Sequence, residues 1–342
     1  MTNSTGFAAA WPIVGHETTV DYLAHGIRFG RVAHAYLLAG PASIGRYTLA
    51  RTYAQALNCQ SETPPCGVCR TCRLIGEDAH PDVRTTQLLP DKREISIDQI
   101  RALQHEATLK PYEAVWKAYI VRDAENLSEE AANCLLKTLE EPPPQVTLIL
   151  VAPTAEAMLP TIVSRCQTLP MHPVPAPRIE SALVEQHGCD QALAKLLARV
   201  SAGRVGWAIQ AAKDSSVLAA RQQLVDRLVR LGTATRVDRF AFAAEYGQRY
   251  GKDAAEREAL HSLLGLWTGW WRDLLLTTCG CPDNVVNLDR IETLRVEARR
   301  YTTAQIRAYL ESLALGELRL RQNVNPRLAL EALVLAIPRQ SH

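Results

Sequence analysis

The chain has 342 residues, of which 47% are apolar and 22% are charged, and its 38 basic and 36 acidic residues give a formal net charge of +2. A chain of this length and composition has room for two or three domains with cores of their own, which excludes a small disulfide-stapled scaffold, a fibrous repeat and a disordered protein. The near balance of charge excludes a strong overall field for nucleic acid or anionic membranes, so any DNA contact has to be local.

The start of the chain and its longest apolar segment show no pattern of export or membrane anchoring. The first fifteen residues, MTNSTGFAAAWPIVG, lack the basic start and apolar core of a secretory signal. The segment Leu263 to Leu276 is shorter than the roughly 20 residues that cross a bilayer, and it includes Arg272 and Asp273. We interpret it as a core helix and expect a cytoplasmic protein without membrane contact. In that reducing compartment the nine cysteines are thiols or metal ligands rather than disulfides.

The first half of the chain has the pattern of an α/β domain. Three short apolar runs predict strands at His34 to Ala39, Ala118 to Val121 and Val146 to Ala152. Helical patterns separate these runs, as expected for a parallel sheet. Between the second and third runs, Ser128 is expected to cap a helix that the prolines from Pro142 onward terminate.

The first predicted strand leads into a loop that keeps the glycines of a phosphate-binding loop but not its functional side chains. The sequence Gly40-Pro-Ala-Ser-Ile-Gly45-Arg46-Tyr47 has the glycine spacing of GxxxxGK[ST]. Arg46 stands where a lysine would reach the β and γ phosphates, and its forked guanidinium is not an equivalent point charge. Tyr47 stands where a hydroxyl would bind magnesium, with its oxygen too far out on a rigid ring. We predict that metal binding fails here; an ordinary tight turn, or a loop that still holds a phosphate on its backbone N–H groups, stays open.

Four cysteines follow at spacings typical of a zinc site. Cys59, Cys66, Cys69 and Cys72 are separated by six, two and two residues, and short CxxC turns suit the thiolate ligands of tetrahedral zinc. A reduced surface loop or a redox pair would not explain the fourth cysteine. We expect a structural zinc with no open coordination position, with His80 as a weaker alternative ligand. The other cysteines are interpreted as small hydrophobes (Cys134, Cys166 and Cys189) or as too few for a metal (Cys279 and Cys281).

The second predicted strand ends in residues that also oppose metal binding. In an ATPase of this kind, an aspartate that binds magnesium and a glutamate that orients water follow this strand. Here Arg122 occupies the metal position and Asp123 follows it. A cation beside the magnesium site repels the ion, and an aspartate is short for the role of the glutamate. Two separate positions therefore predict that this chain does not hydrolyse ATP.

The second half of the chain reads as entirely helical. The segment from Pro170 to Pro177 has four prolines in eight residues and is interpreted as a stiff linker. After it, helical periodicity predicts these helices: Ile179 to Glu185, Gln191 to Val200, Gly206 to Ala212, Val217 to Leu231, Ala254 to Leu276, and three more up to Ile337.

Two groups of residues in this half are candidates for nucleic-acid contacts. Trp267, Trp270 and Trp271 recur at helical spacing, which is more typical of a core or a subunit interface than of a base-stacking platform. Four arginines form a modest basic face that is usually just solvated: Arg290, Arg295, Arg299 and Arg300.

Four motifs together resemble the bacterial clamp-loader subunits of the AAA+ superfamily, most of all their delta-prime type. They are the loop at Gly40, the strand ending in Arg122 and Asp123, the run AANCLLKTLEEPP from Ala131 to Pro143, and the triplet Ser164-Arg165-Cys166. The likeness is dense from Val14 to Cys166, about half of the chain. The resemblance implies an AAA+ fold. Relatives also carry a similar four-cysteine insertion, in which the spacing between the first two cysteines is somewhat longer, so Cys59 matches least well.

The resemblance implies roles for single residues. Arg165 corresponds to an arginine finger, which enters the ATP site of a neighbouring subunit and is worth about 10³ to 10⁵ in rate. In the lid motif, the position of the nucleotide-sensing arginine is Gly206, with Arg204 two residues early. The polar sensor near Val151 to Thr154 is also displaced. These departures fit the delta-prime type rather than the hydrolysing subunits.

We therefore predict a subunit of the DNA polymerase III holoenzyme that is not itself an enzyme. With the gamma/tau and delta subunits it would open the sliding clamp and place it on primed DNA, while ATP binding by its own loop stays open. The predicted domains are an AAA+ nucleotide-binding-like domain at 1–172 with a zinc module at 59–72, a helical lid at 173–214, and an all-α collar domain for oligomerisation at 215–342. The alternatives are an active ATPase of the gamma/tau type with an unconventional loop, and a zinc-dependent nucleic-acid-binding module.

Overall fold

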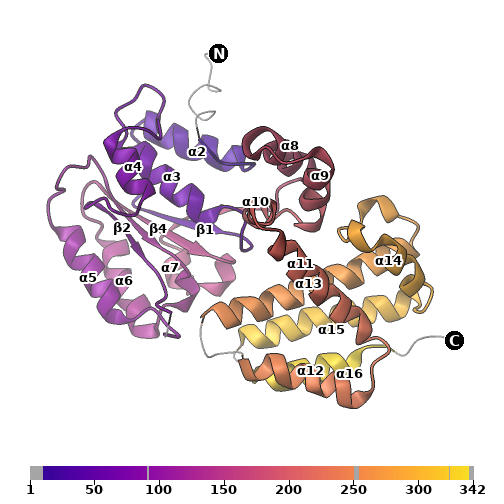
Figure 1. Cartoon of the computed structure of the whole chain (residues 1–342). Coiled ribbons are helices and arrows are strands. Elements are labelled where there is room, and N and C mark those ends of the chain that lie inside the picture. Colours follow the sequence, from indigo (N-terminus) through magenta and orange to yellow (C-terminus); the bar gives the residue numbers. More distant parts are fainter. Residues whose placement is uncertain (1–10, 91, 250–253, 323, 339–342) are drawn as a thin grey trace. The chain divides into compact units, whose positions relative to one another are not determined.

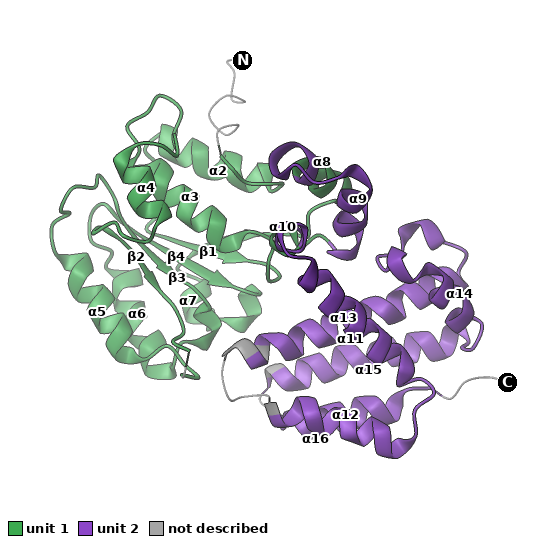
Figure 2. Cartoon of the chain, viewed as in Figure 1, with its two compact units in different colours: residues 1–182, 203–207 green, residues 183–202, 208–342 purple. Residues whose placement is uncertain are grey.

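The computed structural model describes residues 11–90, 92–249, 254–322 and 324–338. The chain divides into two compact units, Met1–Ala182 with Gly203–Trp207 and Leu183–Ala202 with Ala208–His342 (Figure 2). The divisions fall inside α8 (Ala176–His187) and α10 (Val205–Lys213). The three-domain division at residues 172 and 214 stays a prediction.

The first unit is built around a five-stranded, wholly parallel sheet in the order β2-β3-β4-β1-β5. Its strands and helices are α2 (Glu17–Arg28), β1 (Ala35–Ala39), α3 (Arg46–Asn58), α4 (Arg70–Gly76), β2 (Val83–Thr86), α5 (Ile97–Thr108), β3 (Lys117–Val121), α6 (Glu129–Glu140), β4 (Val146–Ala152), α7 (Pro160–Val163), β5 (Gln167–Pro170) and the start of α8. Figure 1 shows α3 on one face of the sheet and α5 with α6 on the other.

The three central strands are buried along their whole length, which is why they read as continuous apolar runs. Alternate residues of these strands, such as Tyr36 and Leu38 in β1 and Ile149 in β4, pack with α2 and α3 in one core. The predicted strands at 34–39, 118–121 and 146–152 are thus confirmed, as is the helix after Ser128, whose side chain accepts a hydrogen bond from the N–H of Ala131. The two edge strands, β2 and β5, were not predicted.

The predicted proline-rich linker is wrong in part. Pro170 is the last residue of β5, and α8 already begins at Ala176. Between them, the N–H of Met171 donates to the carbonyl of Ala39 (2.7 Å) and that of Val174 to the carbonyl of Gly203 (3.0 Å). Both side chains are buried, so this segment is part of the packed unit rather than a free connection.

The second unit is helical throughout its described part. It contains the rest of α8, α9 (Gln191–Val200), most of α10, α11 (Ser215–Arg230), α12 (Arg236–Arg249), α13 (Ala254–Thr278), α14 (Ile291–Ala298), α15 (Thr303–Arg321) and α16 (Pro326–Ala336). The predicted helices are confirmed to within a few residues, but α12 was missed. Gly247 lets α12 approach α16 closely, because a Cβ there would lie 2.6 Å from the Cα of Arg327.

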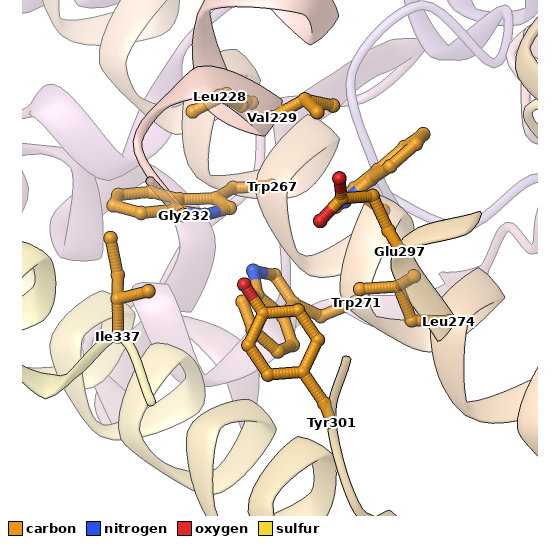
Figure 3. Close-up of a pocket in the computed structure, with 10 residues that line it drawn as sticks. Leu228, Val229, Gly232, Trp267, Trp271, Leu274, Glu297, Tyr301 and Ile337 are labelled. Atoms are coloured by element: carbon orange, nitrogen blue, oxygen red, sulfur yellow. The ribbon is translucent and has the colours of Figure 1, made fainter. Parts of the chain in front are cut away.

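The tryptophans of α13 belong to the core of this unit. Trp267, Trp270 and Trp271 are all buried, and the ring centroid of Trp271 lies 4.4 Å from that of Tyr309. The hollow beside them in Figure 3 has a volume of about 10 Å³, which is about enough for one water and too small for a ligand. The core interpretation of Leu263 to Leu276 is confirmed. Among the described residues, no helix is both long and apolar enough to cross a membrane.

The arginines predicted to form a basic face are largely paired with acidic residues. Arg290 binds Asp226 (2.8 Å), Arg295 binds Glu292 (2.7 Å) and Arg300 binds Glu297 (2.8 Å). Pairing cancels most of the field that such a face would offer to a phosphate backbone.

A buried ion pair joins α11 to the segment that follows α13. The Arg221 side chain lies 3.3 Å from Asp289, both are 5% exposed, and Arg221 also donates to Asn287. The carboxylate of Asp273, fully buried in α13, accepts hydrogen bonds from the N–H groups of Val286 (3.0 Å) and Asn287 (2.7 Å). These contacts hold residues 286–289 against two helices.

Replacing Arg221 with alanine is expected to lower the free energy of unfolding by about 3 kcal/mol, because the buried carboxylate of Asp289 loses its nearer cation, at 3.3 Å, and retains Arg290 at 3.8 Å. Urea unfolding of the full chain measures this. The matched control is Arg295→Ala, whose ion pair is exposed and should cost at most about 1 kcal/mol. Equal urea midpoints for the two variants would contradict the prediction.

Candidate functional site

The glycine loop connects the carboxyl end of β1 to the start of α3. Gly40 has no room for a side chain, because a Cβ there would lie 2.3 Å from the carbonyl oxygen of Met171. Gly45, just before α3, has φ of 102°, a conformation that favours glycine. The structure therefore requires glycine at both positions of the predicted phosphate loop. The first N–H groups of α3 face this loop and have no partners within the helix.

Two carbonyl groups of this loop are bound by residues far away in the sequence. The imidazole Nε2 of His16 lies 3.0 Å from the oxygen of Ile44, and since a carbonyl only accepts, Nε2 carries the proton. The N–H of Gly206 donates to the oxygen of Ser43 (2.7 Å). A Cβ at Gly206 would lie 3.1 Å from that same oxygen. Gly206, predicted to occupy the position of the sensing arginine, therefore packs its backbone directly on the loop.

Tyr47 and Arg122, the two residues predicted to stand in place of metal-binding groups, lie against each other. The guanidinium carbon of Arg122, at the carboxyl end of β3, is 4.5 Å from the ring centroid of Tyr47 in α3, a cation–π contact. The Tyr47 hydroxyl donates to Asp78 (2.7 Å), and Arg122 donates to Gln87 (3.0 Å). Burial raises the pKa of Tyr47. The structure therefore brings together the two residues that the sequence predicted to oppose metal binding.

The other residues predicted for this site lie close by in the chain. Asp123 follows Arg122 with φ of 54° and starts the short turn Ala124–Asn126. Arg46 is the first residue of α3. His16, Asp78 and Gln87 were not predicted as site residues, since each reaches the site from a separate segment without a local motif.

Arg165 is the second residue after α7, at a surface of the first unit. Its NH2 group is 2.7 Å from Oε1 of Glu140, the last residue of α6, and its NH1 group donates to the carbonyl of Thr161 (3.0 Å). The side chain is 36% exposed. The structure thus joins two predicted motifs, because Glu140 belongs to the LLKTLEEPP run and Arg165 to the SRC triplet.

The four cysteines predicted to bind zinc come together. Their sulfur atoms all lie within 4.8 Å of one another; ligands of a tetrahedral zinc at about 2.3 Å would be about 3.8 Å apart. The N–H of Cys66 points at Sγ of Cys59 (3.4 Å) and that of Cys69 at Sγ of Cys66 (3.3 Å). Backbone N–H groups of this kind lower the pKa of Cys66 to about 6. The donor set fits a structural zinc, which these four thiolates would hold with no position left for a reactant.

The cysteine cluster is fixed to α3, and His80, the predicted alternative ligand, lies outside it. Gln55 donates to the carbonyl of Cys72 (2.7 Å) and Arg51 to that of Gly76 (3.0 Å). His80 is buried outside the cluster, where its Nδ1 accepts from the N–H of Asp82 (3.1 Å) and its Nε2 lies 3.6 Å from Glu113. Of the remaining cysteines, Cys134, Cys166 and Cys189 are half-buried, and Cys279 and Cys281 are exposed.

The parallel sheet, the glycine loop between β1 and α3, and the charged residues at the end of β3 define a phosphate-loop module of the AAA+ class. A protein family described as "DNA polymerase III, delta subunit" matches residues 15–175. Subunit delta' of DNA polymerase III from Bacillus subtilis is 30% identical over 317 residues, which cover 92% of this chain and 94% of that protein. The chain belongs to the family of delta-prime subunits of DNA polymerase III.

Related subunits and solved structures are similar over different lengths. The tau subunit from Escherichia coli is 32% identical over 198 residues, which are 56% of this chain and 30% of that protein. A gamma/tau subunit from Mycobacterium tuberculosis is 28% identical over 93% of this chain and 59% of its own length. Among solved structures, a gamma-subunit-related protein from Thermotoga maritima aligns with a TM-score of 0.40 and 18% identity, over 93% of this chain and 99% of that one.

Proposed function

We propose that this chain is a clamp-loader subunit that does not hydrolyse ATP itself and instead supplies Arg165 to a neighbouring ATPase subunit. Its membership of the delta-prime family supports the subunit role. In this proposal it works in the cytoplasm with the gamma/tau and delta subunits to place the sliding clamp on primed DNA. We also propose the domain roles predicted from the sequence: AAA+ module, helical lid and collar.

The observation that carries the first part is the contact between Tyr47 and Arg122. The guanidinium of Arg122 lies 4.5 Å from the ring centroid of Tyr47, which supports a positive charge at the position predicted for magnesium. Repulsion between the two cations disfavours metal binding. Phosphoryl transfer in this class depends on the ion to neutralise charge on the β and γ phosphates. A site with these two residues supports no hydrolysis, which disfavours the active-ATPase alternative.

We expect the isolated chain to turn over no ATP in the presence of magnesium above the rate of a no-protein blank. The measurement is phosphate release, with an active gamma/tau subunit as the positive control. Turnover that depends on magnesium and disappears in a Gly45→Val variant would contradict the proposal and support the active-ATPase alternative.

The surface position of Arg165 supports the second part. The residue lies at the end of α7 with its side chain 36% exposed, and a finger has to be accessible to another subunit. The tryptophans and arginines weakly support the alternative of a nucleic-acid-binding module. The tryptophans are buried, and most of the arginines are paired with acidic side chains. In contrast, Leu328 and Leu335 of α16 are 60% and 50% exposed on one side of that helix, as expected of a domain that assembles with other subunits.

The cysteine cluster completes the proposal as a structural zinc site. Its four thiolates leave no open position, so the metal would stabilise the module and take no part in the chemistry.

A further inference from the structure

The only acidic side chain that binds Arg165 among the described residues is that of Glu140. Oε1 of Glu140 is 2.7 Å from NH2 of Arg165, while NH1 donates to the carbonyl of Thr161 (3.0 Å) and lies 3.4 Å from the hydroxyl of Ser164. The carboxylate comes from α6 and the other two acceptors from α7 and the residue after it. The guanidinium is therefore held from two separate elements.

These contacts occupy part of the guanidinium and leave the rest available. A guanidinium has five N–H donors in a rigid planar fork, and the three hydrogen bonds to Glu140, Thr161 and Ser164 use three of them. The remaining two N–H groups are enough for a bidentate contact with phosphate oxygens. The anchored contacts fix the plane of the fork, so its free donors keep one direction.

The position of Glu140 is not explained by the stability of α6. It is the last residue of the helix, and the negative end of the helix dipole disfavours an acidic side chain there. The ion pair with Arg165 is half-exposed, at 36% and 51%, and exposed pairs contribute little to folding. A locally unfavourable residue with a single specific contact indicates a role in that contact.

We propose that Glu140 is a positioning residue, which holds the Arg165 guanidinium in the orientation that meets the neighbouring subunit's phosphates. This inference rests on the proposed role of Arg165. Glu140 itself touches no reacting group. It restricts the long, flexible side chain of Arg165 before the subunits engage. The entropy cost of orienting that side chain is then not part of the activation free energy.

The test is ATP turnover by the reconstituted clamp loader. With Glu140→Ala, the turnover number at the site served by Arg165 should fall about fivefold, the factor by which an exposed ion pair biases one orientation. The KM for ATP should not change, because the finger acts on charge that develops in the transition state. Glu140→Gln should retain turnover within about twofold, since its amide oxygen can accept the same hydrogen bond.

Two controls separate positioning from general damage. Glu141 is the next residue and is exposed, so Glu141→Ala should behave like the wild type. In the double variant Glu140→Ala with Arg165→Ala, loss of Glu140 should add nothing, because positioning has no effect without the finger. Additive losses, or no rescue by Glu140→Gln, would overturn the positioning role.

The outcomes distinguish this inference from the proposed function. If Arg165→Ala leaves turnover unchanged, the finger itself is wrong and Glu140 has nothing to position. If Arg165→Ala abolishes turnover at that site while Glu140→Ala retains full activity, the finger stands and the positioning role of Glu140 is wrong.

Discussion

Arg165→Ala is expected to slow ATP hydrolysis at the one site that receives this finger by about 10³ to 10⁵, the usual value of an arginine finger. The loss arises because nothing else at the end of α7 can offer forked donors to the charge that develops on the transferred phosphate. Arg165→Lys should rescue little, since an ammonium is a point charge without the planar fork. The chain's own fold should not change, because the Arg165 side chain is 36% exposed and its ion pair with Glu140 is weak.

Single-turnover hydrolysis by the reconstituted loader measures this loss. It separates the slow phase of the site that receives Arg165 from hydrolysis at the ATP sites that do not contact this chain. The matched control is Arg101→Ala, an arginine of α5 with a 65% exposed side chain that forms an exposed ion pair with Asp98. Assembly of the complex has to be equal for both variants. Equal single-turnover rates in the two complexes would show that Arg165 is not a finger.

Strands that are buried along their whole length could be predicted from the sequence, whereas strands that are only partly buried could not. The central strands β1, β3 and β4 are buried at every position, so each appears in the sequence as an unbroken apolar run. The edge strand β2 reads Val-Arg-Thr-Thr, with only Val83 buried, and such a segment has no strand pattern of its own. Pairing with a neighbour, which the sequence does not display, makes it a strand.

Proline misled the prediction at the end of the sheet. The four prolines between 170 and 177 indicated a linker, yet one lies at the end of an edge strand and another in the first turn of α8, and both places tolerate proline. Between β5 and α8, the side chains of Met171 and Val174 are buried and pack into the first unit. The number of prolines carried less information than their positions relative to the neighbouring elements.

The candidate site was predictable where it is local. The glycines of the loop and the four cysteines occur at fixed short spacings, so their grouping followed from the sequence alone. The contacts that shape the site span larger separations: His16 with the carbonyl of Ile44, Tyr47 with Asp78, and Glu140 with Arg165. No spacing rule connects such pairs, because the topology of the sheet brings them together.

Removal of zinc is expected to unfold residues 59–76 and leave the rest of the first unit folded. The helix of this segment, α4, has only seven residues, and its buried residues are Cys72 and Ile75. A helix this short is not stable alone, and structural zinc sites contribute roughly 10 to 16 kcal/mol of binding free energy in isolated zinc-finger peptides. The cysteine cluster is therefore the main source of order in the segment.

Hydrogen exchange measures where that order is lost. With Cys69→Ser or after chelation, the amides of α4 should exchange faster, while those of β1 and β4 keep their protection, because their core side chains pack with α2 and α3 and not with α4. Metal analysis should give one zinc per wild-type chain and none in Cys69→Ser. Cys279→Ser is the control, since Cys279 is exposed and outside the cluster. If α4 stayed protected in metal-free protein, Ile75 and the hydrogen bonds from α3 would be sufficient to hold it and the zinc would have no structural role.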